Sequence, residues 1–90
     1  MPSRSDIARQ LVDVCRRLYA RGFVTATDGN VSARLTGGTI LTTPTGVNKG
    51  QVTEADLVEV TADGTVLAGS RQPSTELGMH LFIYRQRPDA

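Results

Sequence analysis

The sequence predicts an α/β domain whose sheet is mainly antiparallel. Apolar residues recur at helical spacing near the amino terminus, several short apolar runs in the middle are separated by turn residues, and a second helical pattern closes the chain. This order of elements is typical of a domain in which helices pack on a sheet. The short length favours a single unit over residues 1–90.

The first predicted helix covers residues 6–21. Ser5 is its expected amino-terminal cap, and Gly22 is its expected stop. Cys15 lies on the apolar face, so we expect a buried structural thiol rather than a nucleophile. That face is formed by Ile7, Ala8, Leu11, Val12, Cys15, Leu18 and Tyr19.

Two hairpins are predicted after this helix. The first joins its two strands through the turn residues Thr36-Gly37-Gly38. The second is closed by Asp63-Gly64, a dipeptide typical of tight hairpin turns. The four expected strands are residues 31–35, 39–43, 57–60 and 65–67.

Two further helical segments are predicted. Between the hairpins, Thr53 and Asp56 have the spacing of a capping box, which indicates a single helical turn. After the second hairpin, Pro73-Ser74 opens a helix that runs to about Gln86.

Composition and charge argue against several classes of protein. Hydrophobic residues make up 39% and charged residues 21% of the chain, as in soluble globular proteins. The formal net charge is +1 and no basic stripe with interleaved aromatic residues is present, so we expect no nucleic-acid partner. No apolar run approaches the roughly 20 residues of a membrane span, and nothing resembles a signal peptide. We therefore expect a cytoplasmic protein without a membrane partner.

Small polar residues recur at three places where a predicted strand ends or a helix begins. Backbone N–H groups and hydroxyls in such loops can bind phosphate oxygens without a lysine, and the third loop adds the N–H groups of a helix amino terminus. Each loop taken alone is more simply explained as an ordinary turn or cap, and spacing does not show whether the three converge. The loops are Thr27-Asp28-Gly29-Asn30, Thr43-Pro44-Thr45-Gly46 and Pro73-Ser74-Thr75-Glu76.

Glu76 is the candidate for acid–base chemistry, and it also has a structural interpretation. We place it two residues into the last helix, where the helix dipole stabilises an acidic side chain. If it faces the phosphate loops, its carboxylate can act as general acid and base. His80 shares a helix face with Glu76, but a third metal ligand is missing. Because Leu77, Leu81 and Tyr84 surround His80, we expect a partly buried, hydrogen-bonded structural histidine and no metal site.

Five motifs extend across nearly the whole chain. They are Gly29-Asn30-Val31-Ser32-Ala33-Arg34, Thr43-Pro44-Thr45-Gly46 with Lys49-Gly50, Asp56-Leu57-Val58, Pro73-Ser74-Thr75-Glu76 with Met79-His80, and Tyr84 with Arg87-Pro88-Asp89. In this order and spacing they resemble the class II aldolase/adducin family, which includes fuculose-phosphate aldolase and ribulose-phosphate 4-epimerase. Residues 1–90 would then be the amino-terminal portion of one such domain.

The resemblance implies a fold, a site and a cofactor. The fold would be a three-layer α/β/α sandwich around a mainly antiparallel sheet, incomplete in this chain, within a homotetramer. Glu76 matches the carboxylate that shuttles a proton. Zinc or another divalent metal would polarise the substrate carbonyl and stabilise an enediolate, held by histidines expected beyond Ala90. The residues implied to surround the substrate phosphate are Gly29, Asn30, Thr45, Gly46, Ser74 and Thr75.

These implications favour a metal-dependent lyase of carbohydrate metabolism. It would be an aldolase that cleaves or forms a C–C bond in a phosphorylated sugar. Epimerase, dehydratase and decarboxylase chemistry remain open, because substrate choice depends on residues outside this chain. A non-catalytic adducin-like interaction domain is a further alternative, against which Glu76 and the intact small loops argue. A truncated product without activity is another.

Overall fold

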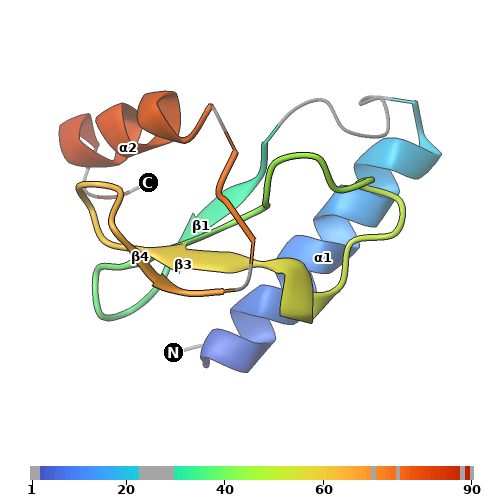
Figure 1. Cartoon of the computed structure of the whole chain (residues 1–90), viewed down its shortest axis with the longest axis horizontal. Coiled ribbons are helices and arrows are strands. Elements are labelled where there is room, and N and C mark those ends of the chain that lie inside the picture. Colours follow the sequence, from blue (N-terminus) through green and yellow to red (C-terminus); the bar gives the residue numbers. More distant parts are fainter. Residues whose placement is uncertain (1–2, 23–29, 70, 75, 88, 90) are drawn as a thin grey trace.

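Four short strands and two helices form the fold in this computed structural model, which describes residues 3–22, 30–69, 71–74, 76–87 and 89 (Figure 1). The strands make one antiparallel sheet in the order β1-β2-β3-β4. The predicted α/β class with an antiparallel sheet is therefore confirmed. The elements are α1 (Arg4–Ala20), β1 (Ser32–Arg34), β2 (Ile40–Thr42), the 3₁₀ turn η1 (Glu54–Asp56), β3 (Val58–Val60), β4 (Val66–Ala68) and α2 (Leu77–Gln86).

Each face of the sheet is covered by one helix, as Figure 1 shows. Consecutive residues of a strand point to opposite faces, and Ile40 and Leu41 of β2 accordingly lie in different apolar clusters. Leu41 packs in the cluster that includes Leu11 of α1. Ile40 packs in the cluster that includes Leu77 of α2. The sheet thus contributes to two cores, one beneath each helix.

Helix α1 begins two residues earlier than the sequence predicted. The backbone N–H of Asp6 donates to Ser3 Oγ at 3.1 Å, and Asp6 Oδ2 accepts from the backbone N–H of Ser3 at 3.2 Å. The prediction of Ser5 as the cap is wrong, because Ser3 and not Ser5 has an acidic residue three positions later to complete a capping box. At the other end, Gly22 has a φ of +74°, which suits the predicted stop. Cys15 is buried as predicted, and burial raises the pKa of its thiol.

Both predicted hairpins are confirmed, although each strand is only three residues long. Their turns use glycines at positive φ, +91° for Gly38 and +95° for Gly64, where other residues would be strained. The short helical turn between the hairpins is confirmed as well. Asp56 Oδ2 accepts from the backbone N–H of Thr53 at 2.9 Å, as half of a capping box requires.

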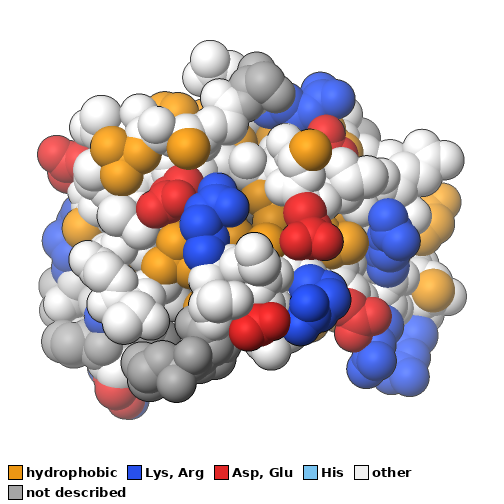
Figure 2. Space-filling model, turned by 90° about the horizontal axis from the view of Figure 1, so that it is seen from below, with side chains coloured by type: hydrophobic (Ala, Val, Ile, Leu, Met, Phe, Trp, Pro, Cys, Tyr) orange, Lys and Arg blue, Asp and Glu red, His pale blue; other side chains and the backbone are white. Residues whose placement is uncertain are grey.

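Charged side chains of both signs lie next to one another on the face shown in Figure 2, with hydrophobic side chains between them. Ion pairs between residues distant in the sequence include Arg4 with Glu59 and Arg71 with Asp56, each with a nitrogen–oxygen distance of 2.9 Å. Within the described residues, neither helix has the length and apolar character needed to cross a membrane.

Glu59 connects strand β3 to helix α1 through its ionised carboxylate. Its Oε1 accepts from Arg4 Nε at 2.9 Å, and its Oε2 accepts from the Thr39 hydroxyl at 2.7 Å. These two hydrogen bonds, with the positive charge of Arg4, hold the pKa of Glu59 below its ordinary value of 4.5.

We predict that Glu59→Gln reduces the free energy of unfolding at pH 7 and that this difference disappears in acid. A carboxylate whose pKa is lowered in the folded state contributes stability above its unfolded pKa, and the contribution is lost as the pH falls through the folded pKa. Urea unfolding of both proteins between pH 7 and pH 3 measures the difference. Glu54→Gln, which removes an exposed carboxylate, is the control. A difference between wild type and Glu59→Gln that stays constant down to pH 3 would contradict the prediction.

Candidate functional site

The side chain of Asn30 is held at the end of strand β2 by two hydroxyls. Its Oδ1 accepts from Thr42 Oγ1 at 3.1 Å and from Thr43 Oγ1 at 2.5 Å. Its Nδ2 is buried and has no hydrogen-bond partner among the residues that the structure describes. A buried amide donor without a partner is costly unless it serves a ligand or another group. Among the described contacts, the side-chain N–H groups of Asn30 are therefore available to a ligand.

Thr43 fixes the backbone on both sides of this contact. Its hydroxyl accepts from the N–H of Val31 at 3.1 Å, and its own N–H donates to the Val31 carbonyl at 3.0 Å. Its side chain is fully buried. Two hydrogen bonds thus hold Thr43, at the start of the second small loop, against the segment that carries Asn30.

The second loop is joined in turn to the third. The N–H of Thr45 donates to the carbonyl of Gln72 at 3.0 Å, and Pro44 forms an isolated antiparallel bridge with Pro73. Thr45 and Gly46 lie exposed on the surface, and Gly46 has a φ of +76° in the turn. Segments that are far apart in the sequence therefore meet at one end of the sheet.

Helix α2 begins later than predicted, and this changes the position of Glu76. The helix starts at Leu77, so Glu76 is its cap residue rather than a residue two positions inside it. The reason is that Pro73 is engaged in the extended bridge to Pro44, so the chain turns before it can become helical. Ser74 makes that turn, since its Oγ accepts from the N–H of Glu76 at 3.1 Å. The carboxylate of Glu76 is exposed and makes no capping hydrogen bond within the described part of the chain.

The described contacts therefore join the segments that carry four of the residues predicted to bind phosphate, namely Asn30, Thr45, Gly46 and Ser74. Glu76 follows Ser74 by two residues, and its N–H donates to the Ser74 hydroxyl. The two remaining predicted residues, Gly29 and Thr75, lie outside the described residues.

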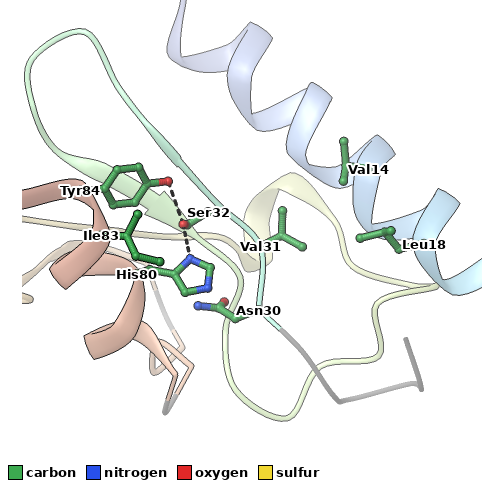
Figure 3. A pocket seen from close by; sticks show the side chains of 8 residues that line it. All are labelled: Val14, Leu18, Asn30, Val31, Ser32, His80, Ile83 and Tyr84. Carbon is green, nitrogen blue, oxygen red and sulfur yellow. Dashed lines mark hydrogen bonds between the residues drawn. The ribbon is translucent and has the colours of Figure 1, made fainter. Parts of the chain in front are cut away.

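His80 is a partly buried, hydrogen-bonded residue, as predicted. Its Nδ1 lies 2.6 Å from Ser32 Oγ, and Tyr84 OH lies 2.9 Å from the same oxygen (Figure 3). These side chains and Asn30 line a pocket of about 360 Å³, whose apolar walls include Val14 and Leu18 of α1. Among the described residues, no group of three or more His, Cys, Asp or Glu side chains could hold a metal ion.

Sequence reasoning missed the role of Thr42 and the contacts of Ser32. Thr42 belongs to a strand that is buried throughout, so its hydroxyl needs a partner inside the protein. Two consecutive threonines at the end of an apolar run, Thr42 and Thr43, are the signal that could have revealed this. The partner of Ser32 could not be read from spacing, because it lies on the last helix.

Solved aldolase structures contain the same fold. An L-fuculose 1-phosphate aldolase matches with a TM-score of 0.87 and 30% identity, covering 94% of this chain and 41% of that chain. L-fuculose-1-phosphate aldolase from Thermus thermophilus matches with a TM-score of 0.75 and 36% identity, covering 91% and 40% of the two chains. The fold is thus of the class II aldolase type.

Residues 9–90 match the sequence profile of the Class II Aldolase and Adducin N-terminal domain. The chain belongs to the class II aldolase and adducin family, which confirms the resemblance seen in its motifs. Methylthioribulose-1-phosphate dehydratase from Acidiphilium cryptum is 45% identical, over 92% of this chain and 39% of that protein. L-fuculose phosphate aldolase from Methanocaldococcus jannaschii is 42% identical, over 90% and 43%. The chain thus spans less than half the length of these relatives.

We predict that Thr43→Val lowers the free energy of unfolding by about 1–3 kcal/mol, the usual cost of leaving a buried polar group without its partner. The change keeps the side-chain shape but removes the acceptor of the Val31 N–H and the donor to Asn30. Urea unfolding measures the loss. The matched control is Thr45→Val on the exposed part of the same loop, which should change stability by no more than about 0.5 kcal/mol. Equal effects of the two substitutions would show that the buried hydroxyl does not organise the loops.

Proposed function

We propose that the complete protein is a lyase that acts on a phosphorylated sugar or a related hydroxy-carbonyl compound, with Glu76 as its general acid and base. The observation that carries this proposal is the set of contacts that joins Asn30 to Thr43, and Pro44 and Thr45 to the segment just before Glu76, whose carboxylate is exposed. Neutral donors on joined segments suit a phosphate group, and a nearby carboxylate suits proton transfer on the bound substrate.

The phosphate would be bound by hydrogen-bond donors that are not used in any described contact. Asn30 Nδ2 is one of them. The Ser74 hydroxyl is another, because its oxygen accepts from the Glu76 N–H while its own hydrogen remains available. Thr45 and Gly46 add an exposed hydroxyl and a backbone N–H. Gly29 and Thr75 complete the proposed set through their match to the family motif.

Glu76 would move the proton. Aldol cleavage breaks the bond between the α and β carbons of a β-hydroxy carbonyl compound. The β-hydroxyl loses its proton and becomes a carbonyl, and the α carbon is left as a carbanion that must gain a proton; formation of the bond requires the reverse transfers. A single carboxylate can serve both directions. Because Glu76 ends the turn that Ser74 opens, an anchored phosphate would hold the substrate carbons within reach of the carboxylate.

A divalent metal such as zinc would supply Lewis-acid stabilisation of the negative charge on the substrate oxygen. The described residues of this chain offer no set of ligands for it. We therefore assign no step to a metal here and expect its ligands elsewhere in the complete protein. We also propose a cytoplasmic homotetramer in which the complete domain is a three-layer sandwich, with residues 1–90 as its amino-terminal portion.

Aldol cleavage is our first candidate reaction. Dehydration is the second, and the observation that favours it is the 45% identity to a methylthioribulose-1-phosphate dehydratase. Loss of water from a β-hydroxy carbonyl compound also begins when a base removes the proton from the carbon next to the carbonyl, and the hydroxyl on the following carbon then leaves as water. The same base role for Glu76 therefore serves both reactions.

We predict that Glu76→Gln in the complete protein lowers kcat by about 100- to 10,000-fold, the usual contribution of a general acid–base group, and leaves KM nearly unchanged. The amide keeps the shape of the side chain but cannot accept the proton. Glu54→Gln, which removes an exposed carboxylate from η1, is the control and should retain wild-type turnover. Undiminished turnover by Glu76→Gln would refute the proton-transfer role.

The products of the same assay separate the two reactions. Cleavage of L-fuculose 1-phosphate at a C–C bond releases two smaller carbonyl compounds, one of which keeps the phosphate. Dehydration of methylthioribulose 1-phosphate instead leaves a single product with one water less. We expect cleavage products, and exclusive dehydration would replace the first candidate with the second. Turnover of neither substrate would favour an adducin-like interaction domain.

A further inference from the structure

Several motif residues with no role in phosphate binding or proton transfer form one contact cluster between β1 and α2. The hydroxyl oxygen of Ser32 on β1 lies 2.6 Å from His80 Nδ1 and 2.9 Å from Tyr84 OH on α2 (Figure 3). Farther along the strand, Arg34 Nη2 donates to the Tyr84 carbonyl at 2.6 Å, and its guanidinium carbon lies 4.9 Å from the centre of the Tyr84 ring. Each of these contacts joins the strand to the helix.

The cluster supplies a directional constraint that the apolar core lacks. Leu77 and Leu81 attach α2 to the sheet by burial, which is not directional. Hydrogen bonds depend on angle as well as distance. His80 and Tyr84 are four residues apart, so they project from the same helix face. Because both reach the same oxygen of Ser32, they fix the rotation of α2 about its own axis.

The two sides of this cluster lie close to the proposed site. Ser32 follows Asn30 by two residues along the strand, and His80 follows Glu76 by one helical turn. The loop before Glu76 is held separately, by the bond between the Thr45 N–H and the Gln72 carbonyl. Rotation of α2 would therefore move Glu76 more than it moves Asn30 and Thr45.

We propose that Ser32, His80 and Tyr84 are positioning residues, which orient α2 so that the Glu76 carboxylate faces the phosphate loops. This inference rests on the function proposed above. The Ser32 hydroxyl can donate to His80 Nδ1 while its oxygen accepts from Tyr84 OH. Both helix side chains therefore lose their partner if this one hydroxyl is removed.

The test is steady-state kinetics of the complete protein with the phosphorylated ketose that it converts. Ser32→Ala removes the hydroxyl, and we expect kcat to fall by roughly 10- to 100-fold, as for a small misplacement of a catalytic group. KM should stay close to the wild-type value, because the phosphate loops are held by other contacts. Ser32→Thr keeps a hydroxyl at the same position of the strand and should restore most of kcat.

Two variants on the helix provide an independent check. Tyr84→Phe removes only one hydroxyl, so it keeps the protein folded even if Ser32→Ala does not, and it should lower kcat without raising KM. His80→Asn places an oxygen or nitrogen where Nδ1 lies, whereas His80→Leu does not. We expect the asparagine variant to retain more of kcat than the leucine variant.

The outcomes distinguish failure of this inference from failure of the proposed function. Normal kcat in both Ser32→Ala and Tyr84→Phe, with an inactive Glu76→Gln, would overturn the positioning role alone. A raised KM with normal kcat would overturn it too, since the cluster would then serve substrate binding. Normal turnover by Glu76→Gln would remove the proposed function and this inference with it.

Discussion

Strand β2 is buried on both of its faces and pairs with a neighbouring strand along each edge. Ile40 contributes to the core under α2, and Leu41 contributes to the core under α1. Water cannot reach the polar groups of such a strand, so the buried hydroxyls that end it need partners within the protein. The chain meets this requirement with the side-chain amide of Asn30, which accepts from both Thr42 and Thr43.

The positions of the residues in the candidate site depend on contacts at the end of that strand. The Thr43 hydroxyl holds the side chain of Asn30, and the extension of the same segment to Pro44 and Thr45 pairs with Gln72 and Pro73. Glu76 follows directly, at the point where the chain becomes helical. A few backbone and hydroxyl contacts near the end of one central strand thus join the segments that carry Asn30, Thr45 and Ser74, which we propose to bind phosphate.

Local features of the fold were predictable from the sequence because they depend on neighbouring residues. The amphipathic pattern indicated the first helix, and the glycine turns at Gly38 and Gly64 indicated both hairpins. Two errors arose where a longer-range or reciprocal interaction decided the outcome. Ser3 caps α1 because its hydroxyl accepts from the Asp6 N–H while the Asp6 carboxylate accepts from the Ser3 N–H. Helix α2 starts later than predicted because Pro73 pairs with a distant segment. The connection between the second and third small loops depends on the same distant pairing, so spacing alone could not reveal it.

We propose that Asn30 and Ser74 bind a substrate phosphate near Glu76. A crystal structure of the complete Glu76→Gln protein, with the phosphorylated ketose that the wild type converts, tests it most directly. We expect a phosphate oxygen within hydrogen-bond distance of Asn30 Nδ2 and of Ser74 Oγ, with the substituted side chain facing the substrate carbons. A phosphate bound elsewhere, with neither donor in contact, would refute the proposed phosphate site.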